Sequence, residues 1–414
     1  MKVLHLSYSD IIGGAARSAY RIHHSLIKKG VSSQMWVNVK SSNDLTIKQP
    51  TSKIDRFLNL SRHRLIKYTL NKLLKTKNTI IHSPSFLPSL LVKHINKSNF
   101  DIVNLHWTQF EMLSISDLAK IEKPTIWTLH DMWAFCGAEH YTNDNRWKEG
   151  YNKNNRPNYE KGFDLNRWTW LRKKKYWKKP LDIVTPSKWL AECVSSSNLM
   201  KNWKVSVVPY PIDTHNWKPL DKNISRKKFN LPKNAKLILF GAPGGGEDPR
   251  KGYDLLLTAL EYLKIQKKIK NTELVIFGQG KSTANKNLEF PIHYMGEIFD
   301  DETLKELYSA ADVVVVPSRQ DNLPNTALEA QACGIPVVSF NIGGLTDIIA
   351  HKKTGYIAKA FDAKDLAKGI FWVLDNYKNV EFGVNAREQI LQKFSEKNIS
   401  ESYEDIYKNI LASL

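Results

Sequence analysis

The apolar residues of this chain fall into short continuous runs, separated by longer stretches with helical spacing. Continuous apolar character without strict alternation is typical of strands that helices cover on both faces. Regular alternation of such strands with helices predicts an α/β fold with parallel sheets. The expected strands are Val3–Ser7, Met35–Val39, Asp101–His106, Thr125–Leu129 and Asp182–Pro186, then Leu237–Gly241, Glu273–Gly278, His293–Met295, Asp312–Pro317 and Pro336–Phe340.

The strands form two sets, separated by a segment with two prolines, Pro209 and Pro211. At 414 residues the chain is also longer than one ordinary hydrophobic core requires. We therefore expect two domains, residues 1–210 and 211–395. No apolar run approaches the roughly 18 residues that span a bilayer, and the first residues read as a strand instead of a signal peptide. Three cysteines without metal-ligand spacing favour a reducing cytoplasm.

Positive charge is concentrated in the first half of the chain. Residues 1–200 contain 32 Lys and Arg against 15 Asp and Glu, whereas residues 201–414 contain 29 against 26. The segment 172–179 reads Arg-Lys-Lys-Lys-Tyr-Trp-Lys-Lys and comes after Trp168 and Trp170. Cations with aromatic residues favour an anionic membrane surface. A solvated basic face is the plainer alternative, and nucleic acid is disfavoured because no recognition motif accompanies the segment.

Several glycines come directly after the expected strands, where open α/β sheets bind their ligands. Gly13 and Gly14 come after the first strand and begin a helix that runs to about residue 29, so the backbone there can approach an anion closely. Gly278 and the pair Gly296-Glu297 lie at the ends of two strands of the second half and could admit a nucleobase. Simple turn chemistry is the alternative interpretation for each of these glycines.

The second half contains a basic pair and a pair of carboxylates. Arg250 and Lys251 come after the glycine run 244–246, which suits a diphosphate, although an exposed basic turn is the alternative. Asp321 comes after an expected strand, and Glu329 lies eight positions later, one turn inside an expected helix. The helix begins near Asn325 and Thr326, whose amides could bind a phosphate. Glu329 could then accept hydrogen bonds from ribose hydroxyls.

In the first half, His130 comes after the strand ending at Leu129 and precedes Asp131. A neutral histidine can bind a sugar hydroxyl or a phosphate oxygen, while a buried structural histidine is the alternative. The segment Asn104-Leu105-His106-Trp107, at the end of the preceding strand, is a weaker candidate for the acceptor side.

These motifs together resemble the retaining glycosyltransferases of family 4, whose E-x7-E signature appears here with Asp321 in the first place. The resemblance implies a GT-B fold: two Rossmann-like lobes facing across a cleft, with a last helix, 396–414, crossing back to the first lobe. It implies a nucleotide-binding second lobe, and an acceptor-binding first lobe with a glycine-rich loop at Gly13. By resemblance, His130 and Asp321 orient the sugar, Arg250 and Lys251 neutralise the diphosphate, and Glu329 binds ribose.

The implied reaction moves a hexosyl group from a UDP- or GDP-linked sugar to a glycan or a polyprenyl-diphosphate-linked saccharide, with retention and without a metal or cofactor. The nearest subgroup is that of the colanic-acid, capsule and exopolysaccharide enzymes of bacteria. We therefore expect a cytoplasmic enzyme at the inner face of the membrane. That subgroup often has several cysteines after the His-Asp pair, where this chain has only Cys136, so the segment 134–179 departs from it. A nucleotide-sugar epimerase or a phosphorylase on the same fold is the alternative function.

Overall fold

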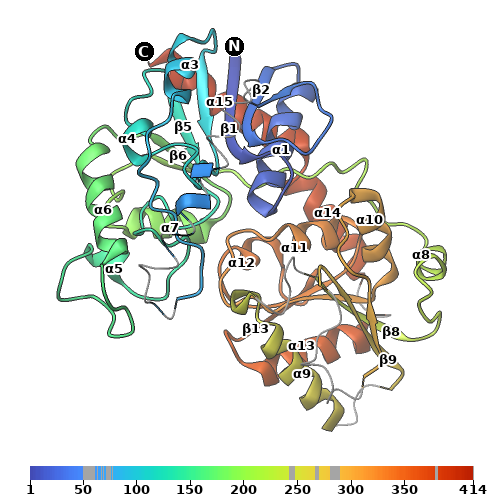
Figure 1. The fold of residues 1–414 in the computed structure, drawn as a ribbon. Helices are drawn as coiled ribbons and strands as arrows, with labels where there is room; N and C mark the ends of the chain where they lie inside the picture. Colours follow the sequence, from blue (N-terminus) through green and yellow to red (C-terminus); the bar gives the residue numbers. More distant parts are fainter. Residues whose placement is uncertain are drawn as a thin grey trace. The chain divides into compact units, whose positions relative to one another are not determined.

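The computed structural model describes residues 1–49, 61–62, 64–66, 68, 70, 76, 78–241, 248–265, 270–279, 290–377 and 381–413. These residues form two compact units, each built on a parallel sheet with helices (Figure 1). Unit 1 comprises residues Met1–Tyr210 and Ile399–Leu414, and unit 2 comprises residues Pro211–Asn398. The prediction of an α/β fold with two parallel-sheet lobes is confirmed.

The sheet of unit 1 has the strand order β3-β2-β1-β4-β5-β6-β7, and every pair is parallel. Buried residues of the central strands, including Leu4, Leu105 and Trp127, form the core with side chains of the covering helices. The strands are β1 (Lys2–Ser9), β2 (Ser32–Val39), β3 (Ile47–Lys48), β4 (Ile102–Leu105), β5 (Thr125–Thr128), β6 (Asp182–Thr185) and β7 (Val205–Val207). The helices are α1 (Gly14–Lys28), α3 (Leu91–Lys97), α4 (Ile115–Leu118), α5 (Arg146–Glu149), α6 (Leu165–Tyr176) and α7 (Lys188–Ser196).

The sheet of unit 2 has the order β10-β9-β8-β11-β12-β13, again with parallel pairs. Its strands are β8 (Lys236–Gly241), β9 (Thr272–Phe277), β10 (Ile292–Tyr294), β11 (Val313–Val316), β12 (Val337–Phe340) and β13 (Gly355–Ala358). Its helices are α8 (Lys222–Lys228), the 3-10 turn η1 (Pro249–Lys251), α9 (Tyr253–Ile265), α10 (Asp301–Ala310), α11 (Asn325–Ala332), α12 (Leu345–Ile348), α13 (Ala363–Asn376) and α14 (Phe382–Lys393).

The last helix, α15 (Glu396–Ala412), ends the chain in unit 1, as the resemblance implied. Its buried Tyr407 accepts a hydrogen bond from Asn104 of β4 at 2.8 Å, and Tyr403 pairs with Thr128 of β5 at 3.2 Å. These two buried bonds attach the helix to the sheet. They also show that Asn104, which is fully buried, supports packing, and its role on the acceptor side stays a prediction.

Three strands were not expected from the pattern: β3, β7 and β13. All three lie at sheet edges. An edge strand has a hydrogen-bonded neighbour on one side only, and such strands are often short and carry polar residues. Strand β3 has only two residues, and Val205 and Ser206 of β7 are half-exposed. Neither strand contains a continuous apolar run that the sequence pattern could reveal.

The basic segment 172–179 comprises the C-terminal part of α6 and the three residues after it, and the structure corrects its interpretation. Lys173 is fully buried and its ammonium group donates to the carbonyls of Trp133, Cys136 and Gly137, so it cannot face a membrane. Arg172 donates to the carbonyls of Pro84 and Ser85. A cation with several carbonyl acceptors can be buried, which the spacing of charges in the sequence does not reveal.

The divergent segment 134–179 is also more internal than its polar composition suggested. Phe135, Cys136, Tyr141 and Trp147 belong to the core of unit 1, and Trp170 is buried as well. The aromatic residues that appeared suited to an interface therefore mostly stabilise the unit.

Candidate active site

The glycine-rich turn of unit 1 connects β1 to α1. Gly13 is the N-cap of α1 and has a φ of 89°, a conformation that glycine adopts without strain. The buried Asp10 fixes this turn, because its carboxylate accepts from the backbone N–H groups of Ile11, Ser41 and Ser42 at 2.8–3.1 Å. Gly13 and Gly14 are exposed. The predicted pair thus begins an accessible helix, and Asp10 is a supporting residue that the sequence analysis missed.

His130 lies just beyond β5 and is 7% exposed. Its Nδ1 is 2.7 Å from the Tyr210 hydroxyl, and its Nε2 is 3.1 Å from Nδ1 of His106. Burial lowers the pKa of His130 to about 4, against the opposing effect of Asp131. The imidazole is therefore neutral near pH 7, as a hydrogen-bonding role requires. His106 is buried and packs against His130. Its burial does not support a direct contact between His106 and an acceptor.

Asp131 anchors the segment after β5 on its other side. Its Oδ2 accepts from Trp107 at 2.8 Å and from His140 at 2.6 Å, and the second nitrogen of His140 lies 2.8 Å from Ser83. Serine, histidine and aspartate in a line are the arrangement of a hydrolase triad. Ser83 is only 2% exposed, however, so a substrate carbonyl does not reach it. Ser83 and His140 therefore serve to fix the position of the Asp131 carboxylate.

In unit 2, the basic turn η1 lies directly against the segment that comes after β11. The N–H of Arg319 donates to the carbonyl of Arg250 at 2.7 Å, and the guanidinium of Arg250 donates to the carbonyl of Gln320 at 3.2 Å. Gly252 permits this approach, since a Cβ there would lie 1.9 Å from the Pro317 oxygen. The structure therefore brings together two motifs that are about 70 residues apart in the sequence.

Asp321 is the counter-ion of the basic pair. Its Oδ2 is 2.7 Å from the ammonium of Lys251 and 3.8 Å from the guanidinium of Arg250. Burial alone would raise the pKa of Asp321, but the two cations bring it below its ordinary value. Asp321 is thus ionised at neutral pH. A Cβ on Gly343 would lie 1.9 Å from the backbone carbonyl oxygen of Asp321, so only glycine allows the two backbones to lie this close. The sequence analysis did not predict this role of Gly343.

Helix α11 begins at Asn325, immediately after this segment. Its N-cap is Pro324, which contributes no capping side chain, and helix N-termini attract anions. Glu329 lies one turn inside α11 as predicted and is 3% exposed. The hydroxyl of Tyr308, on α10, donates to Glu329 Oε2 at 3.1 Å and orients the carboxylate. Tyr308 has no motif around it that could have identified it.

The two glycine candidates after β9 and β10 are in direct contact. The N–H of Gly278 donates to the carbonyl of Gly296 at 2.7 Å, and both glycines have positive φ angles, 84° and 69°. Glu297 is exposed beside them. The glycine run 244–246 lies outside the described residues.

The site residues of unit 2 therefore gather at the carboxyl ends of β9, β10 and β11 and around η1. Among the described residues, no group of three or more His, Cys, Asp and Glu side chains has the arrangement of a metal site.

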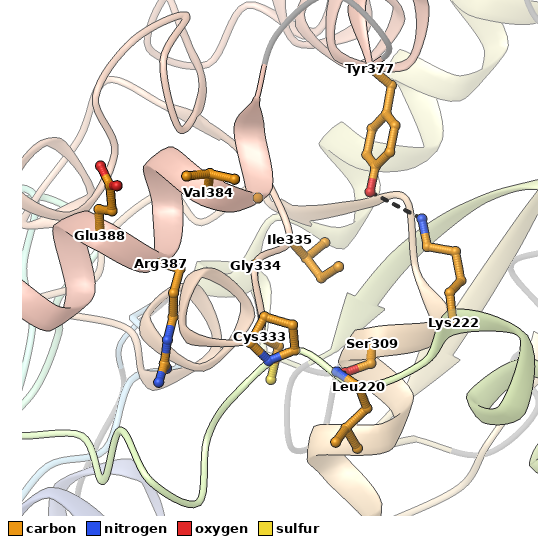
Figure 2. Close-up of a pocket in the computed structure, with 12 residues that line it drawn as sticks. Leu220, Lys222, Ser309, Cys333, Gly334, Ile335, Tyr377, Val384, Arg387 and Glu388 are labelled. Atoms are coloured by element: carbon orange, nitrogen blue, oxygen red, sulfur yellow. Dashed lines mark hydrogen bonds between the residues drawn. The ribbon is translucent and has the colours of Figure 1, made fainter.

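A separate pocket of unit 2, of about 450 Å³, lies at the opposite end of α11 (Figure 2). Cys333 and Gly334, at the end of the helix, line it together with Ile335. Lys222 donates to the Tyr377 hydroxyl at 3.1 Å along its wall. Because the eight residues of α11 span about 12 Å, this pocket is distinct from the cluster at Asn325.

Two family models match consecutive parts of the chain. Residues 12–216 match the model of Glycosyltransferase Family 4, and residues 221–389 match the model of Glycosyl transferases group 1. A D-inositol 3-phosphate glycosyltransferase of Catenulispora acidiphila is 29% identical over 51% of this chain and 52% of its own length. An uncharacterised glycosyltransferase of Methanocaldococcus jannaschii is 32% identical over 55% of this chain and 59% of its own length. The chain thus spans little more than half the length of these relatives.

Solved structures with the same fold cover the whole chain. Sucrose-phosphate synthase of Thermosynechococcus elongatus superposes with a TM-score of 0.67 at 17% identity, covering all of both chains. HepE of Anabaena, solved with UDP and glucose, superposes with a TM-score of 0.65 at 14% identity, also over all of both chains. Two adjoining family matches, the two parallel sheets and the returning last helix agree with one another. The chain belongs to the family 4 glycosyltransferases of the GT-B fold.

Proposed function

We propose that this protein transfers a hexosyl group from a nucleotide sugar to a glycan or lipid-linked saccharide, with retention of configuration. The observation that carries the proposal is the cluster of Arg250, Lys251 and Asp321 at the start of α11. Two cations and a helix N-terminus provide what a nucleoside diphosphate requires, and a carboxylate beside them is suited to sugar hydroxyls. HepE of Anabaena has been solved with UDP and with UDP-glucose, which supports a nucleotide-sugar substrate.

The proposed chemistry rests on the charges of the described residues. As the bond between sugar and diphosphate breaks, negative charge grows on the diphosphate oxygens. Lys251 and Arg250 stabilise that charge, together with the first-turn amides of Asn325 and Thr326. Asp321 then exchanges its ion pair with Lys251 for contacts with the sugar, while Glu329, already oriented by Tyr308, accepts from the ribose hydroxyls. The acceptor hydroxyl attacks on the leaving-group face, and the diphosphate oxygen takes its proton.

The test compares thermal shifts with UDP-, GDP- and ADP-sugars, since a ligand that binds only the native state raises stability. We expect one nucleotide sugar to raise the melting temperature of the wild type but not of Lys251→Ala. The nucleotide sugar that binds is then incubated with acceptor saccharides. Transfer without added metal supports the proposal. An altered free nucleotide sugar without transfer indicates an epimerase, and a strict need for inorganic phosphate indicates a phosphorylase.

We propose further that the acceptor belongs to surface polysaccharide synthesis and that the enzyme works at an anionic membrane. No helix in the described part of the chain is long and apolar enough to cross a bilayer, so contact would be peripheral. The supporting surface is the exposed face of α6 with the residues after it: Lys174, Lys175, Lys178 and Lys179, with the exposed aromatic residues Phe86, Phe163 and Tyr176. Trp168 joins Phe86 and Phe163, with ring centroids 5.8 and 6.1 Å away.

Cosedimentation with vesicles tests this surface. We expect binding to vesicles that contain anionic lipid and loss of binding when Lys174, Lys175, Lys178 and Lys179 are changed to Glu, because each cation near such a surface contributes about 1 kcal/mol. A control variant reverses four exposed lysines of unit 2: Lys352, Lys353, Lys393 and Lys397. Equal loss in both variants, or no binding by the wild type at low salt, would contradict the membrane proposal and leave the sugar-transfer proposal intact.

A further inference from the structure

Three buried histidines of unit 1 form one hydrogen-bonded line that ends at Tyr210. Nδ1 of His5 is 2.8 Å from Nε2 of His106, and Nδ1 of His106 is 3.1 Å from Nε2 of His130. Nδ1 of His130 is then 2.7 Å from the Tyr210 hydroxyl. The histidines come from the adjacent strands β1, β4 and β5 or from the residues just after them, which is why they meet.

All three imidazoles are neutral at physiological pH. Burial lowers the pKa of His5 and of His106 well below the ordinary value, and neighbouring histidines, His23 among them, lower it further. Burial likewise lowers the pKa of His130, to about 4. A neutral imidazole carries one ring proton, so one nitrogen donates and the other accepts.

The line therefore has only two self-consistent proton arrangements. In the first, every histidine is protonated on Nδ1, and His130 donates to the Tyr210 oxygen. In the second, every histidine is protonated on Nε2, and Tyr210 donates to His130. A mixed arrangement would place two donors, or two acceptors, face to face at one of the bonds.

Nε2 of His5 decides between the two arrangements. It is buried and has no hydrogen-bond partner among the described residues. The nearby His23 already uses both of its nitrogens, on Ser33 at 2.7 Å and on Thr46 at 2.9 Å. The second arrangement would leave a buried N–H of His5 without an acceptor. The first leaves Nε2 of His5 unprotonated, so that only an acceptor nitrogen lacks a partner. Among backbone groups, buried N–H groups without a partner are rarer than buried acceptors without one, and the same preference applied to the imidazole favours the first arrangement.

We propose that His5 and His106 are positioning residues that hold the proton of His130 on Nδ1, so that His130 presents a neutral hydrogen-bond donor to a substrate oxygen. The Tyr210 oxygen occupies that acceptor position in this structure. The role toward a substrate rests on the proposed function, whereas the tautomer itself does not. Asp131 is the charged neighbour of His130, and its carboxylate is engaged with Trp107 and His140.

NMR of the wild-type protein labelled with ¹⁵N-histidine tests the tautomer directly, because protonated and bare imidazole nitrogens differ widely in chemical shift. The His130 signals are assigned as those missing from His130→Gln. We expect proton-bearing Nδ1 and bare Nε2 at His130, unchanged between pH 6 and pH 8. A proton on Nε2 of His130, or a titration of His130 in this range, would overturn the proposal. Neither result depends on finding a sugar-transfer activity.

Variants of His106 test the function of the line. The amide of Asn can replace the Nδ1–H of His106, whereas Leu cannot. We expect His106→Leu to lower kcat for transfer roughly ten- to hundredfold, by analogy with removing the outer partner of a metal-bound histidine, with nucleotide affinity unchanged. His106→Asn should keep most of the rate. The exposed His94→Asn is the control.

Equal rates in His106→Leu and wild type would refute the positioning role, as would a nucleotide affinity that falls with the rate. If His106→Leu does not fold, the pair His5→Asn and His5→Leu makes the same comparison one step further along the line. If neither the wild type nor any variant transfers a sugar, the proposed function is contradicted. The NMR measurement would still decide which nitrogen of His130 carries the proton.

Discussion

Replacing Asp321 by Asn separates nucleotide binding from sugar transfer. The change keeps the shape of the side chain but removes the charge that pairs with Lys251 at 2.7 Å and lies 3.8 Å from Arg250. A hydrogen bond to a charged group is worth about 1.5–3 kcal/mol when buried. Both side chains are partly exposed, 10% for Asp321 and 20% for Lys251, so we expect a loss of about 2 kcal/mol in the free energy of unfolding. For a unit of this size, that lowers the melting temperature by roughly 4–8 °C.

The same substitution should have opposite effects on two functional measurements. The rate of transfer should fall about 100-fold, because the sugar loses the group that orients it. The affinity for free nucleoside diphosphate should stay the same or increase, because Asp321 no longer competes for Lys251. Titration calorimetry with the nucleotide and initial rates with the nucleotide sugar measure the two effects.

Asp312→Asn is a matched control for this experiment. Asp312 also pairs with two cations, Arg226 at 2.7 Å and Lys222 at 2.9 Å, but it lies before β11, at the other end of the strand. We expect a similar loss of stability and a normal rate of transfer. If Asp321→Asn loses nucleotide affinity and transfer in equal proportion, Asp321 is structural and the assignment of the carboxylate pair is wrong.

Three further predictions concern the basic pair, metal ions and pH. Lys251→Ala and Arg250→Ala should each lower the rate of transfer by the equivalent of roughly 2–4 kcal/mol in the activation free energy, without unfolding the protein; normal rates in both variants would refute the phosphate assignment. Transfer should persist in excess EDTA, and a complete loss that only Mg²⁺ or Mn²⁺ restores would refute the metal-independent mechanism. Stability should fall as the pH is lowered from about 6.5 to 4, because burial lowers the pKa of His23 to about 3 and of His130 to about 4, so the unfolded chain binds more protons in this range. The expected loss at pH 4 is on the order of 5 kcal/mol, and urea unfolding at pH 7, 5 and 4 with a constant free energy would contradict it.

The sequence by itself determined the elements that local chemistry controls. Central strands such as β4 and β11 are continuous apolar runs, because helices cover both of their faces, and that pattern is visible without a structure. The start of α1 at Gly14 and the place of Glu329 inside α11 are also set by short-range signals. Motifs at strand ends could be identified for the same reason, since parallel sheets collect them at one edge.

The tertiary structure alone decided which charges and nitrogens meet. Nothing in the sequence pairs Lys251 with Asp321, or orders His5, His106 and His130 in a line, because hydrogen bonds between distant segments depend on the packing of whole strands. The burial of Lys173 is the clearest case. In the sequence it is one of three consecutive lysines, but one face of α6 packs inward, where three backbone carbonyls replace water around its ammonium group.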